Sequence, residues 1–352
     1  MKRASFLLIV FLFLVTAYPA NGATLGDINA DSSVGLPEAV YALQVTSGIR
    51  PQSTTGDPYD FSEYFFVENG RYIYDYANYP GTTGGTVQNT CQTYDVSRET
   101  FNGNDAMAVI FNMTSKSYYA IGSQYINYLG YYNPGNITAP TAVMIQPYII
   151  GARAMEPGAV YAFGSQSSAS PASLDIRETV FLGLEDVTVP AGIFTNCLKM
   201  LTRTSNFTYL DYYAKGVGMV KRYVAMTASS SGSTMALMSA RVGGANYPNG
   251  STYYLGQGTW NKTVGGESVQ TGSFAMPFTL PAPTSSPLYL NGFLNNNLPL
   301  IVPLSSQDGV NFTGTATPAS LTVQGNTITG TVTYTSDVTY IVQIAGTYSP
   351  AP

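Results

Sequence analysis

R-Y-I-Y-D-Y, residues 71–76, decides the fold class by its alternation, and N-G at 69–70 stands directly before it. Side chains that follow one another on a β-strand point to opposite faces, so Tyr72, Tyr74 and Tyr76 are expected to share one face. Asn-Gly is typical of a tight turn between strands. Similar runs recur along the chain, with turn residues between them, at 106–113, 142–150, 180–184, 198–203 and 218–226. This pattern predicts a mainly β protein of antiparallel strands.

The composition limits both the size and the chemistry of the protein. At 352 residues the chain is long enough for about two domains. Charged residues make up 10% of it, against about 25% in an ordinary soluble domain. Histidine is absent, which excludes Ser-His-Asp and Cys-His catalysis and any metal or haem site with histidine ligands. The net charge of −5 argues against a nucleic-acid partner, because nucleic acids bind basic surfaces.

Residues 1–23 have the pattern of a secretory signal peptide. A basic start at Lys2 and Arg3 is followed by an apolar run over 6–15 and by small residues up to Ala23, the three-part order of such signals. The apolar run is too short to span a bilayer, which takes about 20 residues, and no later stretch reaches that length. We expect a secreted protein with no transmembrane segment after signal cleavage, located in the periplasm, at the cell envelope or outside the cell.

A candidate calcium loop follows the signal, in the sequence G-D-I-N-A-D-S-S-V-G-L-P-E at 26–38. Asp27, Asn29 and Asp31 stand at positions 1, 3 and 5 of a twelve-residue loop of the EF-hand type. Ser33 at position 7 offers its backbone carbonyl, and Glu38 at position 12 can bind in bidentate fashion. Ca²⁺ prefers such an oxygen set, so we expect this loop to hold Ca²⁺. A solvated acidic loop that caps a short helix is the alternative interpretation.

Residues 26–51 resemble one repeat of a dockerin, the calcium-dependent module by which extracellular proteins attach to cohesin partners. The resemblance lies in the G-D-x-N-x-D start, in apolar Val34 at loop position 8 and in the acid at position 12. It implies a loop–helix calcium module over 24–51 and a cohesin-like or envelope protein as partner. Ser32 stands where glycine is usual, and a single repeat is present.

Cys91 and Cys197 are the two cysteines of the chain. An even number of cysteines in an exported protein favours a disulfide, so we expect these residues to be bonded to each other. Two buried, unpaired thiols are the alternative.

The remaining chain reads as two β domains after a linker at 52–58. L-E-D-V-T-V-P-A-G-I-F-T-N-C-L-K-M (184–200) and Y-Y-A-K-G-V-G-M-V-K-R (212–222) resemble a pattern of bacterial envelope proteins whose curved antiparallel sheet forms a half-barrel like that of lipoprotein carriers. This resemblance covers about 59–244 and implies that fold there. Residues 245–352 predict a smaller β-barrel or sandwich, and their G-T-W start at 258–260 resembles lipocalin-like barrels, although plain core packing of Trp260 is the simpler interpretation.

The sequence supports binding more readily than catalysis. Six tyrosines gather between 118 and 132, and aromatic planes stack on sugars, so polysaccharide is one candidate partner; tyrosine is also simply common in strands. The acids offer no recognised catalytic pair: Asp60 with Glu63 matches no known motif, and Glu185 and Asp186 are adjacent. Our leading hypothesis is an exported, non-catalytic, calcium-binding interaction protein. The alternatives are a periplasmic carrier of a hydrophobic ligand and a glycoside hydrolase that uses Asp and Glu.

Overall fold

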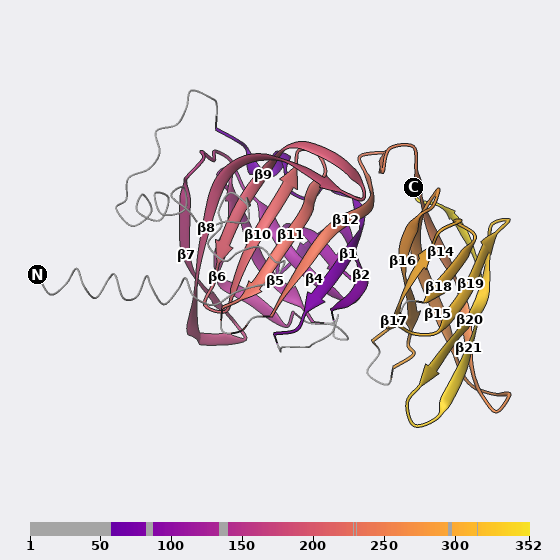
Figure 1. The fold of residues 1–352 in the computed structure, drawn as a ribbon. Helices are drawn as coiled ribbons and strands as arrows, with labels where there is room; N and C mark the ends of the chain where they lie inside the picture. Colours follow the sequence, from indigo (N-terminus) through magenta and orange to yellow (C-terminus); the bar gives the residue numbers. More distant parts are fainter. Residues whose placement is uncertain are drawn as a thin grey trace, which may run out of the picture. The chain divides into compact units, whose positions relative to one another are not determined.

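The computed structural model describes residues 58–81, 87–133, 140–227, 229, 231–294, 298–314 and 316–352. Within these ranges the regular elements are strands, apart from one short 3₁₀ turn, η1 (Phe61–Glu63) (Figure 1). The prediction of a mainly β, antiparallel protein is therefore confirmed.

The first sheet contains thirteen strands, each hydrogen-bonded to its neighbour in the chain. Its pairings are antiparallel, and β1 also pairs with β12, so the strands β1 to β12 close into a barrel while β13 extends the sheet beside β12. The strands are β1 (Arg71–Tyr79), β2 (Gln88–Phe101), β3 (Asn104–Phe111), β4 (Ser115–Ile121), β5 (Tyr125–Tyr132), β6 (Ala142–Ala152), β7 (Val160–Ser167), β8 (Ser170–Val189), β9 (Gly192–Arg203), β10 (Phe207–Ala214), β11 (Gly218–Met226), β12 (Gly232–Val242) and β13 (Ala245–Tyr247).

Closure of this sheet differs from the half-barrel that the sequence resemblance implies. The closing ladder runs from Arg71 opposite Arg241 to Tyr79 opposite Gly232, along the whole of β1. An open sheet would leave the backbone N–H and C=O groups of both edge strands without partners, and a barrel removes those edges. A long twisted sheet also curls, which brings its first and last strands together. Local sequence patterns do not encode this pairing of β1 with a strand about 160 residues later.

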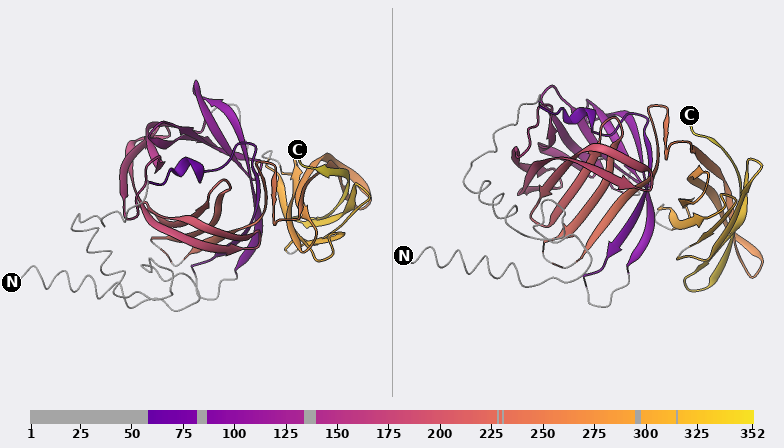
Figure 2. Two further views of the ribbon diagram at one scale, coloured as in Figure 1. Left: turned by 90° about the horizontal axis from the view of Figure 1, so that it is seen from above. Right: turned by 45° about the horizontal axis from the view of Figure 1, so that its top comes forward.

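The segment before β1 enters the interior of this barrel. In the left view of Figure 2 the indigo η1 lies inside the ring of strands. Asp60 caps η1 by accepting a hydrogen bond from the Ser62 N–H at 2.8 Å. The Phe61 ring packs edge-on against Tyr213 of β10, at 4.9 Å between ring centroids, and Phe65 packs against Tyr119 of β4 at 5.0 Å. The segment therefore fills one part of the barrel core with aromatic rings.

A second barrel of eight strands closes independently through the pairing of its first strand with its last. The strands are β14 (Thr252–Val264), β15 (Glu267–Leu280), β16 (Thr284–Asn291), β17 (Leu300–Ser306), β18 (Asn311–Gly314), β19 (Ala319–Gln324), β20 (Thr327–Thr335) and β21 (Thr339–Pro350). Trp260 is buried in its core, where the indole N–H donates to the Ser273 carbonyl at 2.9 Å. A hairpin at 324–327 joins β19 to β20, with positive φ at Gly325 and Asn326 as a tight I′ turn requires.

Candidate functional site

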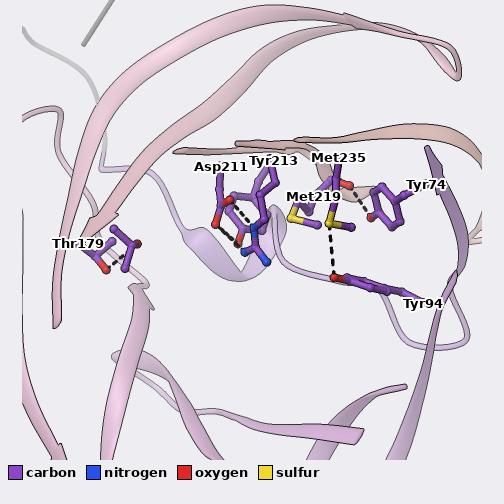
Figure 3. Close-up of polar contacts among 9 residues, drawn as sticks. Tyr74, Tyr94, Thr179, Asp211, Tyr213, Met219 and Met235 are labelled. Carbon is purple, nitrogen blue, oxygen red and sulfur yellow. Dashed lines mark hydrogen bonds and ion pairs between the residues drawn. The ribbon is translucent and has the colours of Figure 1, made fainter. Parts of the chain in front are cut away.

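The inner wall of the twelve-stranded barrel carries polar and aromatic side chains. Strand alternation directs every second residue inward, and Figure 3 shows Asp211, Tyr213, Met219, Met235 and Tyr94 on the inside of the curved sheet. These residues come from β10, β11, β12 and β2, which lie apart in sequence but meet in the closed barrel. The inner wall is our candidate site.

An ion pair stands at the centre of this wall. The register of β10 and β11 places Asp211 directly opposite Arg222. Arg222 Nε donates to Asp211 Oδ1 at 2.6 Å, and Nη2 donates to Oδ2 at 2.7 Å, which is a bidentate geometry. The Tyr213 hydroxyl donates to the same carboxylate at 3.3 Å. The Asp211 side chain is 8% exposed, while that of Arg222 keeps 26%.

The protonation states around this pair follow from burial and charge. Burial opposes the charged form of Arg222, but the Asp211 carboxylate outweighs burial and holds the pKa of the guanidinium well above its usual value. Burial, reinforced by the Asp211 charge, raises the pKa of Tyr213 well above its usual range. Around neutral pH the guanidinium is therefore charged and the Tyr213 hydroxyl is protonated, so both act as hydrogen-bond donors.

Tyrosine rings continue the inner wall around the barrel. On one side Tyr94 lies 5.0 Å from Tyr74 between ring centroids, and its hydroxyl donates to Met235 Sδ at 3.8 Å. Further round, Tyr119 lies 5.3 Å from Tyr128, and Tyr128 stacks on Tyr148 at 4.7 Å. These rings belong to β1, β2, β4, β5 and β6. Burial raises the pKa of Tyr94 to about 12, so its hydroxyl stays protonated.

A second guanidinium completes this aromatic wall. Arg177 of β8 lies over the Tyr148 ring, with its Cζ 3.9 Å from the ring centroid, which is the geometry of a cation–π contact. Its neighbour Ile176 is 62% exposed, so strand alternation directs Arg177 inward. The wall thus presents flat faces, both of rings and of guanidinium groups.

The segment that contains η1 fills part of the barrel interior. Eight strands enclose an interior that their own side chains just fill, and barrel diameter grows roughly in proportion to strand number. Twelve strands close this barrel, and the segment with η1 packs into its core. Arg222 faces inward, and its side chain keeps 26% exposure.

The predicted calcium ligands Asp27, Asn29, Asp31, Ser33 and Glu38 lie outside the described residues. Within the residues that the structure does describe, no group of three or more Cys, Asp or Glu side chains could hold a metal ion. In the same ranges no helix is long and apolar enough to cross a membrane.

The predicted disulfide between Cys91 and Cys197 is wrong. Both thiols are free and buried, and they lie in different clusters. Cys91 packs with Ile73, Tyr253 and Ala351, on the outer face of β2, whereas Cys197 belongs to the core cluster of the first barrel. An even cysteine count carries no information on which faces of a sheet the two side chains occupy.

The tyrosines between 118 and 132 do not form one surface. Tyr119 faces inward, because it packs against the core cluster of the first barrel, and Tyr128 contacts it there. Tyr118 stacks instead on Phe101, at 4.3 Å between centroids, in a small separate cluster. Tyr125 is exposed. Strand alternation therefore divides the six tyrosines between the two faces of the sheet.

The acids that were weighed as catalytic candidates are held by partners. Asp60 accepts from Arg153 Nε at 2.6 Å, and Glu63 pairs with Lys215 at 2.8 Å. Glu185 forms an ion pair with Lys199 at 2.9 Å. Its neighbour in the chain, Asp186, accepts a hydrogen bond from the Asn196 N–H at 2.8 Å. Each of these carboxylates therefore has a partner for at least one of its oxygens.

Sequence reasoning missed the most polar part of the interior, which is made by Asp211, Arg222, Arg177 and Tyr148. The available signal was Y-L-D-Y-Y at 209–213 followed by K-R-Y at 221–223. On two consecutive strands this spacing places one acid and one base on the same face. Only the closed sheet shows that this face is the inner one.

Comparisons with known proteins identify no family. No family model and no curated protein matches the chain. Among solved structures, a presumed exported protein with a YmcC-like fold from Bacteroides fragilis is 15% identical, with a TM-score of 0.26 over 50% of this chain and 97% of that one. A presumed lipoprotein from Parabacteroides distasonis is 12% identical, with a TM-score of 0.27 over 52% of this chain and 99% of that one. Similarity at this level carries no inference about the function of this chain.

Proposed function

We propose that the protein is an exported, non-catalytic binding protein that carries a ligand inside its twelve-stranded barrel. The signal-like residues 1–23 support export. The observation that carries the binding function is the Asp211–Arg222 pair, which faces the interior and yet leaves Arg222 26% exposed. Sites for small molecules combine an aromatic or apolar lining with a few polar groups that orient the ligand. The inner wall has both components.

The experiment is native mass spectrometry of the mature chain, residues 24–352, purified from the periplasm of a producing bacterium. The proposal predicts a non-covalent adduct that is lost when the protein is denatured, or binding of an added compound to the stripped protein. The variant Arg222→Gln should carry less adduct, whereas Tyr125→Ala on the outer face should carry as much as the parent. A protein that carries no adduct and binds neither sugars nor lipids would overturn the proposal.

We propose in addition that residues 24–51 hold Ca²⁺ and attach the protein to a cohesin-like or envelope partner. The support is the oxygen set of Asp27, Asn29, Asp31, Ser33 and Glu38 at the spacing of a calcium loop. Isothermal calorimetry of the full mature chain with Ca²⁺ tests the metal site. We expect one site, abolished by a double change of Asp27→Ala and Glu38→Gln. Equal heats with the parent and the double variant would overturn this assignment.

A further inference from the structure

We propose that the second barrel is a brace for the first: it packs on the outer face of β12, β1 and β2 and so holds the pairing of β1 with β12 by which the first barrel closes. The inference assigns a role to the second barrel that does not depend on a ligand. It is argued from side chains that point outward from a barrel and are nevertheless buried.

The outer face of the first barrel is covered where the barrel closes. Ile73 of β1 lies between Ser239 of β12 and Thr93 of β2 in the register of the sheet, and residues opposite one another on neighbouring strands share a face. Tyr72 and Tyr74 belong to the interior cluster, so strand alternation directs Ile73 and its two register partners outward. All three are at most 2% exposed. A row of outward side chains across the closing pairing is therefore buried.

The second barrel supplies the cover. Tyr289 of β16 stands between Leu288 and Leu290, which pack in the core of the second barrel, so alternation directs Tyr289 to the outer face of that barrel. Tyr253 of β14 packs with Ile73 in one apolar cluster. Both tyrosines are at most 1% exposed. The outer faces of the two barrels thus bury each other's side chains.

A hydrogen-bond network fixes the position of Tyr289 on the first barrel. The Tyr289 hydroxyl donates to Asn112 Oδ1 at 3.0 Å and shares a hydrogen bond with Thr93 Oγ1 at 2.6 Å. Thr93 also holds Asn112 in place, because Asn112 Oδ1 accepts from the Thr93 N–H and the Asn112 N–H donates to the Thr93 carbonyl, both at 2.9 Å. All three residues are buried. A buried polar group that loses its partner costs free energy, so the network favours this one arrangement.

The cover contacts both strands of the closing pairing. Met238 of β12 and Ile73 of β1 pack in the same cluster as Tyr253 and Leu255 of β14. Separation of β12 from β1 would expose apolar surface on both barrels, which opposes the separation. The second barrel therefore stabilises the closed form of the first.

Hydrogen exchange of the full mature chain, residues 24–352, tests the brace through its effect on the other barrel. Tyr289→Phe keeps the ring but removes both hydrogen bonds of the hydroxyl. We expect the amides of β1 and β12 to exchange roughly tenfold faster, because local opening of this pairing loses less free energy when the network is broken. The amides of β19 and β20, in the second barrel itself, should exchange as in the parent. Tyr340→Phe is the matched control. It removes a hydroxyl that bonds Asp337 within the second barrel and should leave β1 and β12 unchanged.

The other outcomes decide against the brace. Unchanged exchange of β1 and β12 in Tyr289→Phe would overturn it. Equal acceleration in both barrels would do the same, because it would show a general loss of stability rather than an effect on the closing pairing. If Tyr289→Phe fails to fold by circular dichroism, Leu255→Ala provides the second test. It removes an apolar contact of the second barrel with the shared cluster and should also accelerate exchange in β1 and β12 more than in β19 and β20.

Discussion

The register of β10 and β11 brings Asp211 and Arg222 together as an ion pair inside the barrel. They lie directly opposite each other on β10 and β11, and both side chains point inward. A buried charge that keeps its partner is stable, whereas one that loses its partner pays the full cost of desolvation. The interior of the barrel therefore depends on both members of the pair.

Replacement of Asp211 alone should destabilise the protein. Asp211→Asn leaves the Arg222 charge without its counter-ion, and we expect a loss of about 2–3 kcal/mol, below the full cost of breaking a buried pair because Arg222 is partly exposed. The double variant with Arg222→Gln should regain part of this loss. Urea denaturation of the parent, of Asp211→Asn and of the double variant measures both values. Equal stability of the parent and Asp211→Asn would contradict the role of the pair.

Replacement of Asp95, in contrast, should stabilise the protein at neutral pH. Burial raises the pKa of this carboxyl, and Arg71, opposite it across β1 and β2, offsets only part of the shift. A raised pKa means that the folded state holds the proton more tightly than the unfolded state, so ionisation destabilises the fold at neutral pH. Asp95→Asn should therefore raise stability at pH 7 and have less effect near pH 4. Thermal unfolding at both pH values measures it, and a lower Tm at pH 7 would contradict the argument.

At the scale of elements, the strands follow from local patterns but their closure does not. The runs 142–150, 198–203 and 218–226 fall on β6, β9 and β11, and the run 106–113 overlaps β3, which ends at Phe111. Alternation and turn residues are local signals, so the sequence shows them. The β1–β12 pairing and the position of η1 inside the barrel depend on contacts between distant residues, which no window of sequence contains. That is why the half-barrel was expected and why the inner wall was not recognised.

The packing of η1 inside the barrel can be tested by a substitution in β6. Gly151 of β6 lies so close to Phe61 that a Cβ there would overlap with the ring. Gly151→Ala should force Phe61 out of place, with a loss of about 1–3 kcal/mol from overpacking. Adding Phe61→Leu should relieve the overlap and recover part of the loss. Chemical denaturation measures the three variants. If Gly151→Ala alone is as stable as the parent, the segment does not pack there.

At the scale of the whole molecule, the cysteines show the limit of composition as a guide. Their even number indicated a disulfide, but Cys91 and Cys197 belong to separate clusters. Composition did indicate the class of fold, because Tyr, Thr, Val and Gly favour strands and turns throughout the chain. Pairing between particular residues needs the three-dimensional register, and the sequence alone contains no direct record of it.

The two buried thiols should be unreactive toward thiol reagents in the folded protein. Burial raises the pKa of both Cys91 and Cys197 to about 12, so almost no thiolate forms at pH 8. The folded protein should not react with Ellman's reagent, and the protein unfolded in urea without reductant should release two equivalents. Dithiothreitol should leave the Tm unchanged. An absence of reactive thiols in urea would show that a disulfide forms after all.

The most direct test of a ligand-carrying barrel is a crystal structure of the mature chain, residues 24–352, purified together with the compound that it carries. We expect ligand density inside the ring of β1 to β12, within hydrogen-bond distance of Asp211 or Arg222. Ligand density on the outer surface alone, or an inner wall closed by the protein's own side chains, would contradict this function.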